Sequence, residues 1–158
     1  MMKPKTKRIL TYTVSVLIAL AVGVASAWIN SGKFDTPTLA VPPLTPTPWL
    51  FPVVWAILYT LMGVSAAQVY VADCPGKSDA LFIYAVQLAV SFLWAVFYFT
   101  FQAAAISFVW LIFLLLLVIL MMIRFERCHP GSGKLQIPYL IWLCFAAYLN
   151  FSVWMLNQ

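Results

Sequence analysis

Residues 80–123, ALFIYAVQLAVSFLWAVFYFTFQAAAISFVWLIFLLLLVILMMI, decide the fold of this 158-residue chain. The stretch contains no Asp, Glu, Lys, Arg or His, and its 44 residues are about twice what one helix needs to cross a bilayer. Its second half also lacks the alternation of polar and apolar residues that a transmembrane β-strand requires. The stretch therefore predicts two consecutive transmembrane helices, with the turn between them at Gln102-Ala-Ala-Ala.

Three more runs without charged residues or histidine occur at 9–32, 36–72 and 135–158. Charged residues make up 8% of the chain and hydrophobic residues 65%, which leaves too little polar surface for a soluble globular protein. The sequence predicts an all-α integral membrane protein, a five-transmembrane-helix bundle that forms a single membrane domain over residues 1–158. Its helices are expected at about 9–30, 48–71, 80–100, 104–123 and 138–156, with a proline-rich, pocket-covering loop at 31–47.

Positive charge is distributed unevenly over the predicted loops. Of the nine basic residues, four lie within 3–8, Lys77 follows the second helix, and three lie within 124–134. Only Lys33 falls on the opposite side. Because positively charged loops stay in the cytoplasm, the N-terminus is expected to be cytoplasmic, and such a bundle suits a bacterial plasma membrane. The net charge of +5 then indicates contact with anionic lipid headgroups, and no nucleic-acid partner is expected.

The first helix has a second interpretation as a secretory signal peptide. A basic segment, an apolar core and Ala25-Ser26-Ala27 match the pattern of a cleaved signal. However, Ala19, Gly23 and Ala27 are spaced four residues apart and form a small-residue face on which another helix can pack. We therefore expect the helix to be retained.

Cysteine and histidine suggest no further chemistry. Cys74 and Cys128 are expected in cytoplasmic loops and Cys144 in the last helix, so no disulfide is expected. The single histidine, His129, has no partner ligands at metal-binding spacing. No metal site is predicted.

Aromatic and weakly polar side chains recur at helical spacing on three of the predicted helices. Such stripes of large rings with a few hydrogen-bonding groups are typical of a pocket for a flat, largely apolar ligand. The stripes are Trp55, Tyr59 and Met62; Gln87, Ser91, Trp94 and Tyr98; and Tyr139, Trp142, Phe145 or Ala146, and Leu149 or Asn150.

Plainer roles are open to some of these residues. Trp28, Trp49 and Trp154 lie near span ends, where tryptophan commonly forms an interfacial belt. Gln87, Ser91 and Asn150 can also hold neighbouring helices together by hydrogen bonds. No span contains an ionisable Asp, Glu, His, Lys or Arg, which disfavours ion-coupled transport.

Three segments carry a family resemblance: PPLTPTPWLFPVVWAILYTLMG at 42–63, QLAVSFLWAVFYF at 87–99 and PYLIWLCFAAYLN at 138–150. In order and spacing they resemble the tryptophan-rich sensory protein family, whose animal members are the mitochondrial translocator protein or peripheral benzodiazepine receptor. The resemblance implies a five-helix bundle, commonly a homodimer, whose pocket binds porphyrins and, in animal members, cholesterol and benzodiazepine-site ligands. By position, it places pocket residues at Trp55, Tyr59, Ser91, Trp94, Trp142, Phe145 and Ala146.

The chain departs from the family pattern at several positions. Ser91 stands where the family usually has Asn, and Leu44 stands where it usually has Trp. No Lys or Arg follows Tyr148, so the proposed sterol motif is absent, which argues against cholesterol as the natural ligand.

We therefore expect a receptor-like or carrier-like protein that binds protoporphyrin IX or a similar flat lipophile, in stress or tetrapyrrole regulation, and that needs no bound cofactor. One alternative is a light- and oxygen-dependent porphyrin-degrading enzyme with Trp55 and Trp142 as catalytic residues. Another is a structural or partner-modulating membrane protein that assembles through Ala85 and Ala89. The candidate ligand-binding residues are Trp55, Tyr59, Gln87, Ser91, Trp94, Tyr98, Trp142, Phe145, Ala146 and Asn150.

Overall fold

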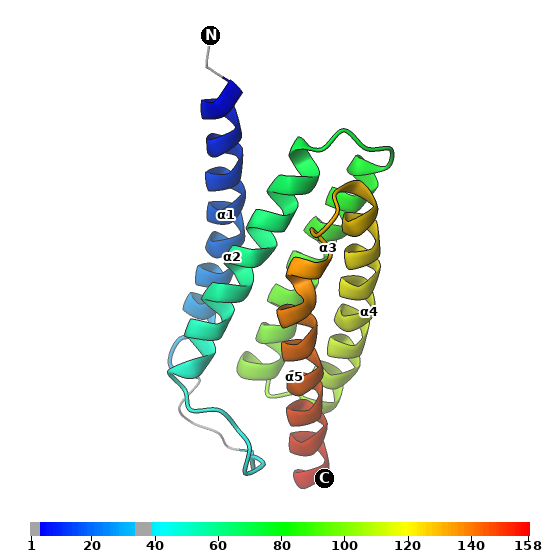
Figure 1. The fold of residues 1–158 in the computed structure, drawn as a ribbon. Coiled ribbons are helices and arrows are strands. Elements are labelled where there is room, and N and C mark those ends of the chain that lie inside the picture. Colours follow the sequence, from blue (N-terminus) through cyan, green and yellow to red (C-terminus); the bar gives the residue numbers. More distant parts are fainter. Residues whose placement is uncertain (1–3, 34–38) are drawn as a thin grey trace.

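The computed structural model describes residues 4–33 and 39–158 and shows five long helices over these residues (Figure 1). All five are long and apolar enough to cross a membrane, which confirms the predicted all-α membrane bundle. In chain order they are α1 (Pro4–Ile29), α2 (Leu50–Val71), α3 (Lys77–Ala95), α4 (Ala104–Cys128) and α5 (Ile137–Leu156). A π-helical turn, η1 (Val96–Thr100), extends α3, and a 3₁₀ turn, η2 (Lys134–Gln136), precedes α5.

The connections gather at two opposite ends of the bundle (Figure 1). The start of α1 and the α2–α3 and α4–α5 loops lie at one end, which we call the basic end. The segment that leads into α2, the α3–α4 turn and the C-terminus lie at the other, which we call the loop end. The described basic residues follow the predicted asymmetry: Lys33 is at the loop end, whereas Lys5, Lys7, Arg8, Lys77, Arg124, Arg127 and Lys134 are at the basic end.

Glycine allows α1 and α2 to cross at close range. A Cβ atom on Gly63 would lie 2.5 Å from Cα of Val16, so the two backbones meet at this point. The Ser15 hydroxyl adds a 2.8 Å hydrogen bond to the Gly63 carbonyl oxygen. On the facing side, Gly23 makes room for the ring of Tyr59, which a Cβ atom would approach to 2.6 Å. The small-residue face predicted for the first helix therefore packs against α2 within the same chain.

The main hydrophobic core lies among α2, α3, α4 and α5. The pairs α3–α4 and α4–α5 pack along most of their lengths, and α1 is peripheral, with its most extensive contact to α2 (Figure 1). Among the described side chains of α1 only Ala19 and Ser26 are buried, and Asn30, directly after the helix, is buried as well. The largest fully buried core side chains include Tyr139, Phe125, Met62, Leu111 and Leu143.

The turn between α3 and α4 falls where the sequence predicts it. The helix widens at η1, where the amide of Phe101 donates to the carbonyl oxygen of Val96. Gln102 then takes a left-handed conformation with φ 49°, and α4 begins at Ala104. A single left-handed residue reverses the chain without Gly or Pro, although a long side chain tolerates this conformation less well than glycine does.

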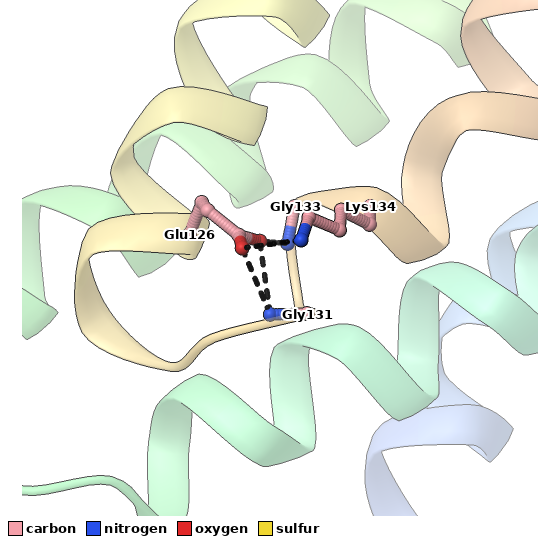
Figure 2. Close-up of polar contacts among 4 residues, drawn as sticks. All are labelled: Glu126, Gly131, Gly133 and Lys134. Atoms are coloured by element: carbon pink, nitrogen blue, oxygen red, sulfur yellow. Dashed lines mark hydrogen bonds and ion pairs between the residues drawn. The ribbon is translucent and has the colours of Figure 1, made fainter.

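The α4–α5 turn is built around one carboxylate (Figure 2). Glu126 accepts hydrogen bonds from the amides of Gly131 at 3.0 Å and Gly133 at 3.1 Å. Gly131 has φ +93°, and a Cβ atom on Gly133 would lie 2.4 Å from the Met122 carbonyl oxygen. Lys134 lies 3.8 Å from the same carboxylate in an exposed ion pair. Glu126 lies on the last turn and a half of α4, which continues past the predicted end at residue 123 to Cys128.

The expectation that no disulfide forms is wrong. Cys74, in the α2–α3 loop, is bonded to Cys128, the last residue of α4, and the two are 54 residues apart in the chain. Sequence spacing does not show that these positions meet, because the contact arises from the packing of α3 against α4. Cys144 of α5 is an exposed free cysteine.

Candidate ligand-binding site

A cavity of about 380 Å³ lies between α1, the N-terminal half of α2 and the C-terminal half of α3. We call it the main cavity. Its volume falls within the range typical of small-molecule sites. Its walls are mostly apolar or aromatic, and Trp55, Tyr59, Ser91 and Trp94 are the candidate residues that line it. Three of them are buried from outside solvent and line only the cavity: Tyr59, Ser91 and Trp94.

Trp55 is the centre of the aromatic wall. Its ring centroid lies 5.5 Å from that of Tyr59 and 6.1 Å from that of Trp94, with both pairs of planes tilted by 33°. Trp94 in turn stacks on Tyr98, with centroids 5.7 Å apart and planes 15° from parallel. These are the separations at which aromatic rings attract one another, so the wall is a connected array that presents ring surface to the cavity.

Ser91 is the unusual polar group of this wall. The residue is 2% exposed, and its hydroxyl lies near the phenol groups of Tyr59 and Tyr139 but makes no hydrogen bond of good geometry among the described residues. A buried hydroxyl without a partner costs free energy. Ser91 therefore offers a hydrogen bond to a polar atom of a molecule inside the main cavity.

Two other candidate residues bind protein groups and do not line the cavity. Gln87 accepts a 3.1 Å hydrogen bond from the Tyr139 hydroxyl and joins α3 to α5. With its amide oriented to satisfy both sides, Asn150 accepts from Trp94 Nε1 at 3.0 Å and donates to the Ala104 carbonyl oxygen. All three bonds join different helices, as in the alternative role considered for these side chains, and the bond from Trp94 to Asn150 fixes the indole of Trp94.

The α5 candidates lie beyond the main cavity wall. Trp142 contacts Phe51 edge-on at 5.7 Å, and Phe51 itself lines the cavity. Phe145 packs on Trp142 at 5.6 Å, and Ala146 is buried in the core. Trp142 Nε1 is buried without a hydrogen-bond partner among the described residues. Phe51 thus separates Trp142 from the cavity.

A second cavity of about 260 Å³ lies toward the loop end and shares Pro48, Phe51 and Phe99 with the first. We call it the loop-side cavity. Tyr98, the remaining candidate residue, lines it together with Lys33 and Gln102. The two cavities are therefore neighbours divided by aromatic rings.

A polar relay connects Lys33 to the main cavity. The Lys33 ammonium donates to the Thr100 hydroxyl at 3.0 Å, and this hydroxyl donates to the Asn30 carboxamide oxygen at 2.9 Å. Asn30 is fully buried and its nitrogen donates to the Ser26 carbonyl oxygen at 2.7 Å. The relay ties the end of α1 to η1, and its Lys33 places a cation at the loop-side cavity.

The sequence interpretation omitted the contribution of α1 to the site. Gly23, Val24, Ala27 and Asn30 line the main cavity, as does Trp49 just before α2. The four-residue spacing of small side chains in the first helix was the available signal, because a small-residue face brings a helix close to its neighbours. Val24 and Trp49 are also 67% and 66% exposed, so the cavity wall reaches the outer surface of the bundle.

Comparison with known proteins agrees with this architecture. The sequence pattern of the TspO/MBR family matches residues 15–155. The chain is 32% identical to the tryptophan-rich protein TspO of Chlorobaculum tepidum over 155 residues, which cover 96% of this chain and 98% of the relative. It is 37% identical to the tryptophan-rich sensory protein of Cereibacter sphaeroides over 112 residues, 71% of this chain and 70% of the relative. It is also 30% identical to the translocator protein of Ovis aries over 124 residues, 77% of this chain and 73% of the relative.

An aromatic cavity in a five-helix membrane bundle, together with a match over most of the sequence, leads to one assignment. This chain belongs to the TspO/MBR family of membrane proteins.

Proposed function

We propose that the protein is a membrane receptor or carrier that binds a porphyrin such as protoporphyrin IX, or a similar flat lipophile, in the main cavity. The observation that carries the proposal is the array of Trp55, Tyr59 and Trp94 on one cavity wall. A flat conjugated ligand gains most where several ring faces are held ready for it, since these rings lose little freedom on binding.

One polar group in each cavity fits a ligand with a flat apolar body and carboxylate arms. The unpartnered Ser91 hydroxyl lies in the main cavity, where it meets a hetero-atom of the ligand body. Lys33 lies at the loop-side cavity, where its ammonium pairs with one carboxylate. A single cation leaves a second carboxylate to water, so we expect moderate affinity that falls as salt rises.

Phe51 and Phe99 divide the two cavities, so a large macrocycle has to displace them. Both rings are half-buried, and they meet edge-on with their centroids 6.2 Å apart. We expect a macrocycle to occupy both cavities with these rings rotated, and a smaller lipophile to occupy the main cavity alone.

The test is a titration of the purified protein in lipid nanodiscs with protoporphyrin IX in the dark, followed by absorbance and tryptophan quenching. Trp55→Ala should weaken binding at least tenfold, about 1.4 kcal/mol. Trp28→Ala is the matched control, because Trp28 is 77% exposed and does not line the cavity. Saturable binding that is equal in both variants would place the ligand elsewhere, and no saturable binding would reject the porphyrin.

A light-dependent breakdown of the bound porphyrin is the second candidate, favoured by the position of Trp55 on the cavity wall. Light would excite the macrocycle, dioxygen would be the oxidant, and an indole would exchange an electron with the ligand. Trp142 is the second indole, behind Phe51. Trp55→Phe should therefore slow product formation under light more than Trp142→Phe does. Equal rates in both variants and the parent, with binding retained, would reject the role of the indoles.

We propose that the basic end faces the cytoplasm of a bacterial plasma membrane. Seven described basic residues at this end support the orientation. Reporter enzymes fused after Gln158 test it, because a reporter active only outside the cytoplasm should be active there. Activity of a cytoplasmic reporter at the same position would reverse the orientation.

We also propose a homodimer. Ala85 and Ala89 are exposed four residues apart on α3 and leave room for the close approach of another helix. Ala85→Leu with Ala89→Leu should shift the protein to monomers in nanodiscs, as measured by single-molecule photobleaching. Ala25→Leu, on the exposed face of α1, is the control. A protein that is monomeric before substitution would reject the dimer.

A further inference from the structure

A disulfide lies at the basic end of the bundle, away from the two cavities. The Cys74–Cys128 bond joins the α2–α3 loop to the end of α4. We propose that this pair is a reversible thiol–disulfide exchange site that reacts with low-molecular-weight thiols and disulfides of the cytoplasm.

The location of the bond favours a reversible role over a purely structural one. Both cysteines lie at the end that carries seven of the described basic residues, and the orientation proposed above puts that end in the cytoplasm. Cytoplasmic thiols are kept reduced, and the disulfides found there are usually transient or redox-sensing. The proposal rests on this orientation, and it is independent of the ligand in the cavity.

Both cysteines are accessible to a small reagent. Cys74 and Cys128 are each only partly buried, and both lie next to loops rather than inside the bundle. Acidic and basic residues both lie close to them in sequence, with Asp73 and Lys77 near Cys74 and Glu126 and Arg127 near Cys128. Cys144 is near the middle of α5, so it is not placed to resolve a mixed disulfide at this end.

The surroundings keep the two thiols close after reduction. The Ser132 hydroxyl donates to Gln68 at 2.9 Å, and the Ser65 hydroxyl donates to the Ser132 carbonyl oxygen at 2.6 Å, so the α4–α5 loop is fixed to α2 without the disulfide. The Lys77 ammonium donates to the Ala72 carbonyl oxygen at 2.8 Å and holds the α2–α3 loop. The Cα atoms of the pair are 5.2 Å apart. Reduction therefore loosens a tether without dismantling the end of the bundle.

Reduction of the pair takes place in two exchange steps. A thiolate of a dithiol reductant attacks one cysteine sulfur, the Cys74–Cys128 bond breaks, and the other cysteine leaves as a thiolate that takes up a proton. The second thiol of the reductant then attacks the mixed disulfide, releases the first cysteine and leaves the reductant as a disulfide. Two electrons pass from the reductant to the protein. A low-molecular-weight disulfide returns the pair to the oxidised state by the reverse steps.

The test uses a Cys144→Ala chain, in which only the pair remains. Bacterial cells that express it are quenched in acid and labelled with a polyethylene-glycol maleimide, before and after a pulse of the thiol oxidant diamide. We expect two adducts per chain before the pulse, none after it, and recovery on washout. The matched Cys74→Ser, Cys144→Ala chain, which cannot form the bond, should keep one adduct in most molecules.

Two outcomes would overturn the proposal. A pair that gives no adduct in growing cells is a permanent structural disulfide, and a pair that gives two adducts after the pulse does not respond to oxidant. The purified oxidised protein supplies a second measurement, by equilibration with mixtures of reduced and oxidised glutathione. We expect half-reduction within a physiological range of ratios, whereas resistance at every ratio would again indicate a structural bond.

Discussion

The carboxamide of Asn157 pairs with both backbone groups of Ala40. Its oxygen accepts from the Ala40 amide at 2.8 Å, and its nitrogen donates to the Ala40 carbonyl oxygen at 2.9 Å. The same nitrogen donates to Val153 in the last turn of α5. The segment that leads into α2 is therefore fastened to the C-terminal helix, beside the loop-side cavity, which Val153 also lines.

Replacing Asn157 by Ala should release this segment with little loss of global stability, because the bonds are exposed and each contributes about 1 kcal/mol at most. We expect hydrogen exchange at residues 39–45 to accelerate several-fold, and the ligand to associate and dissociate faster. Ser152→Ala is the control, since the Ser152 hydroxyl bonds only within its own helix to Tyr148. Unchanged exchange in Asn157→Ala would show that other contacts hold the segment.

Replacing Ser91 by Ala should stabilise the ligand-free protein by up to about 1 kcal/mol, because it removes a buried hydroxyl that makes no hydrogen bond of good geometry. The same change should weaken binding of a ligand that accepts a hydrogen bond and leave binding of a hydrocarbon ligand unchanged. Thermal unfolding in nanodiscs and two parallel titrations measure these effects. Ser107→Ala is the comparison, because the buried Ser107 hydroxyl already bonds to the Ala103 carbonyl oxygen. Equal changes of stability and of ligand affinity in the two variants would contradict the role given to the Ser91 hydroxyl.

Replacing Gly63 by Ala should destabilise the protein by about 1–3 kcal/mol, since the added methyl group has no space against the backbone of α1. It should also enlarge or distort the main cavity, because α1 forms one of its walls. Unfolding in mixed detergent micelles and a ligand titration test both effects. Ala25→Leu is the control. It adds bulk to the exposed face of α1 and should change neither the free energy of unfolding nor the affinity for the ligand.

Replacing Glu126 by Ala should loosen the α4–α5 turn, because the amides of Gly131 and Gly133 lose their acceptor. Glu126→Gln keeps an acceptor without the charge and should have an intermediate effect. Lys134→Gln should have almost no effect, because the ion pair is exposed and 3.8 Å long. The rate of proteolysis in the turn and the thermal unfolding temperature rank the three variants by their effect. If Lys134→Gln had a larger effect than Glu126→Ala, the ion pair rather than the amide hydrogen bonds would hold the turn.

The number of helices could be predicted because it depends on chain length and hydrophobicity alone. Residues 80–123 are too long for one span, and Gln102 is the polar residue near their middle. Helix ends were harder to place. α3 begins at Lys77, three residues before the predicted start, and the Lys77 ammonium binds carbonyl oxygens of Tyr70 and Ala72. These two bonds across the α2–α3 loop leave no mark in the hydropathy of the sequence.

The neighbours of each helix could not be predicted, because periodicity indicates which face is apolar and not what covers it. Trp55, Tyr59, Ser91 and Trp94 meet at one cavity because α2 and α3 converge there. The α5 stripe has the same spacing, yet Trp142 lies behind Phe51. The Cys74–Cys128 contact depends on the same missing information, since it joins two positions that only the packing of the bundle brings together.

Val24 and Trp49 belong both to the wall of the main cavity and to the outer surface of the bundle. A lipophile small enough for the cavity therefore chooses between the protein and the surrounding acyl chains, which are similarly apolar. Its occupancy depends on its mole fraction in the lipid rather than on its concentration in water. A dissociation constant measured at one lipid-to-protein ratio should then rise in proportion when more lipid is added, as the added hydrocarbon dilutes the ligand.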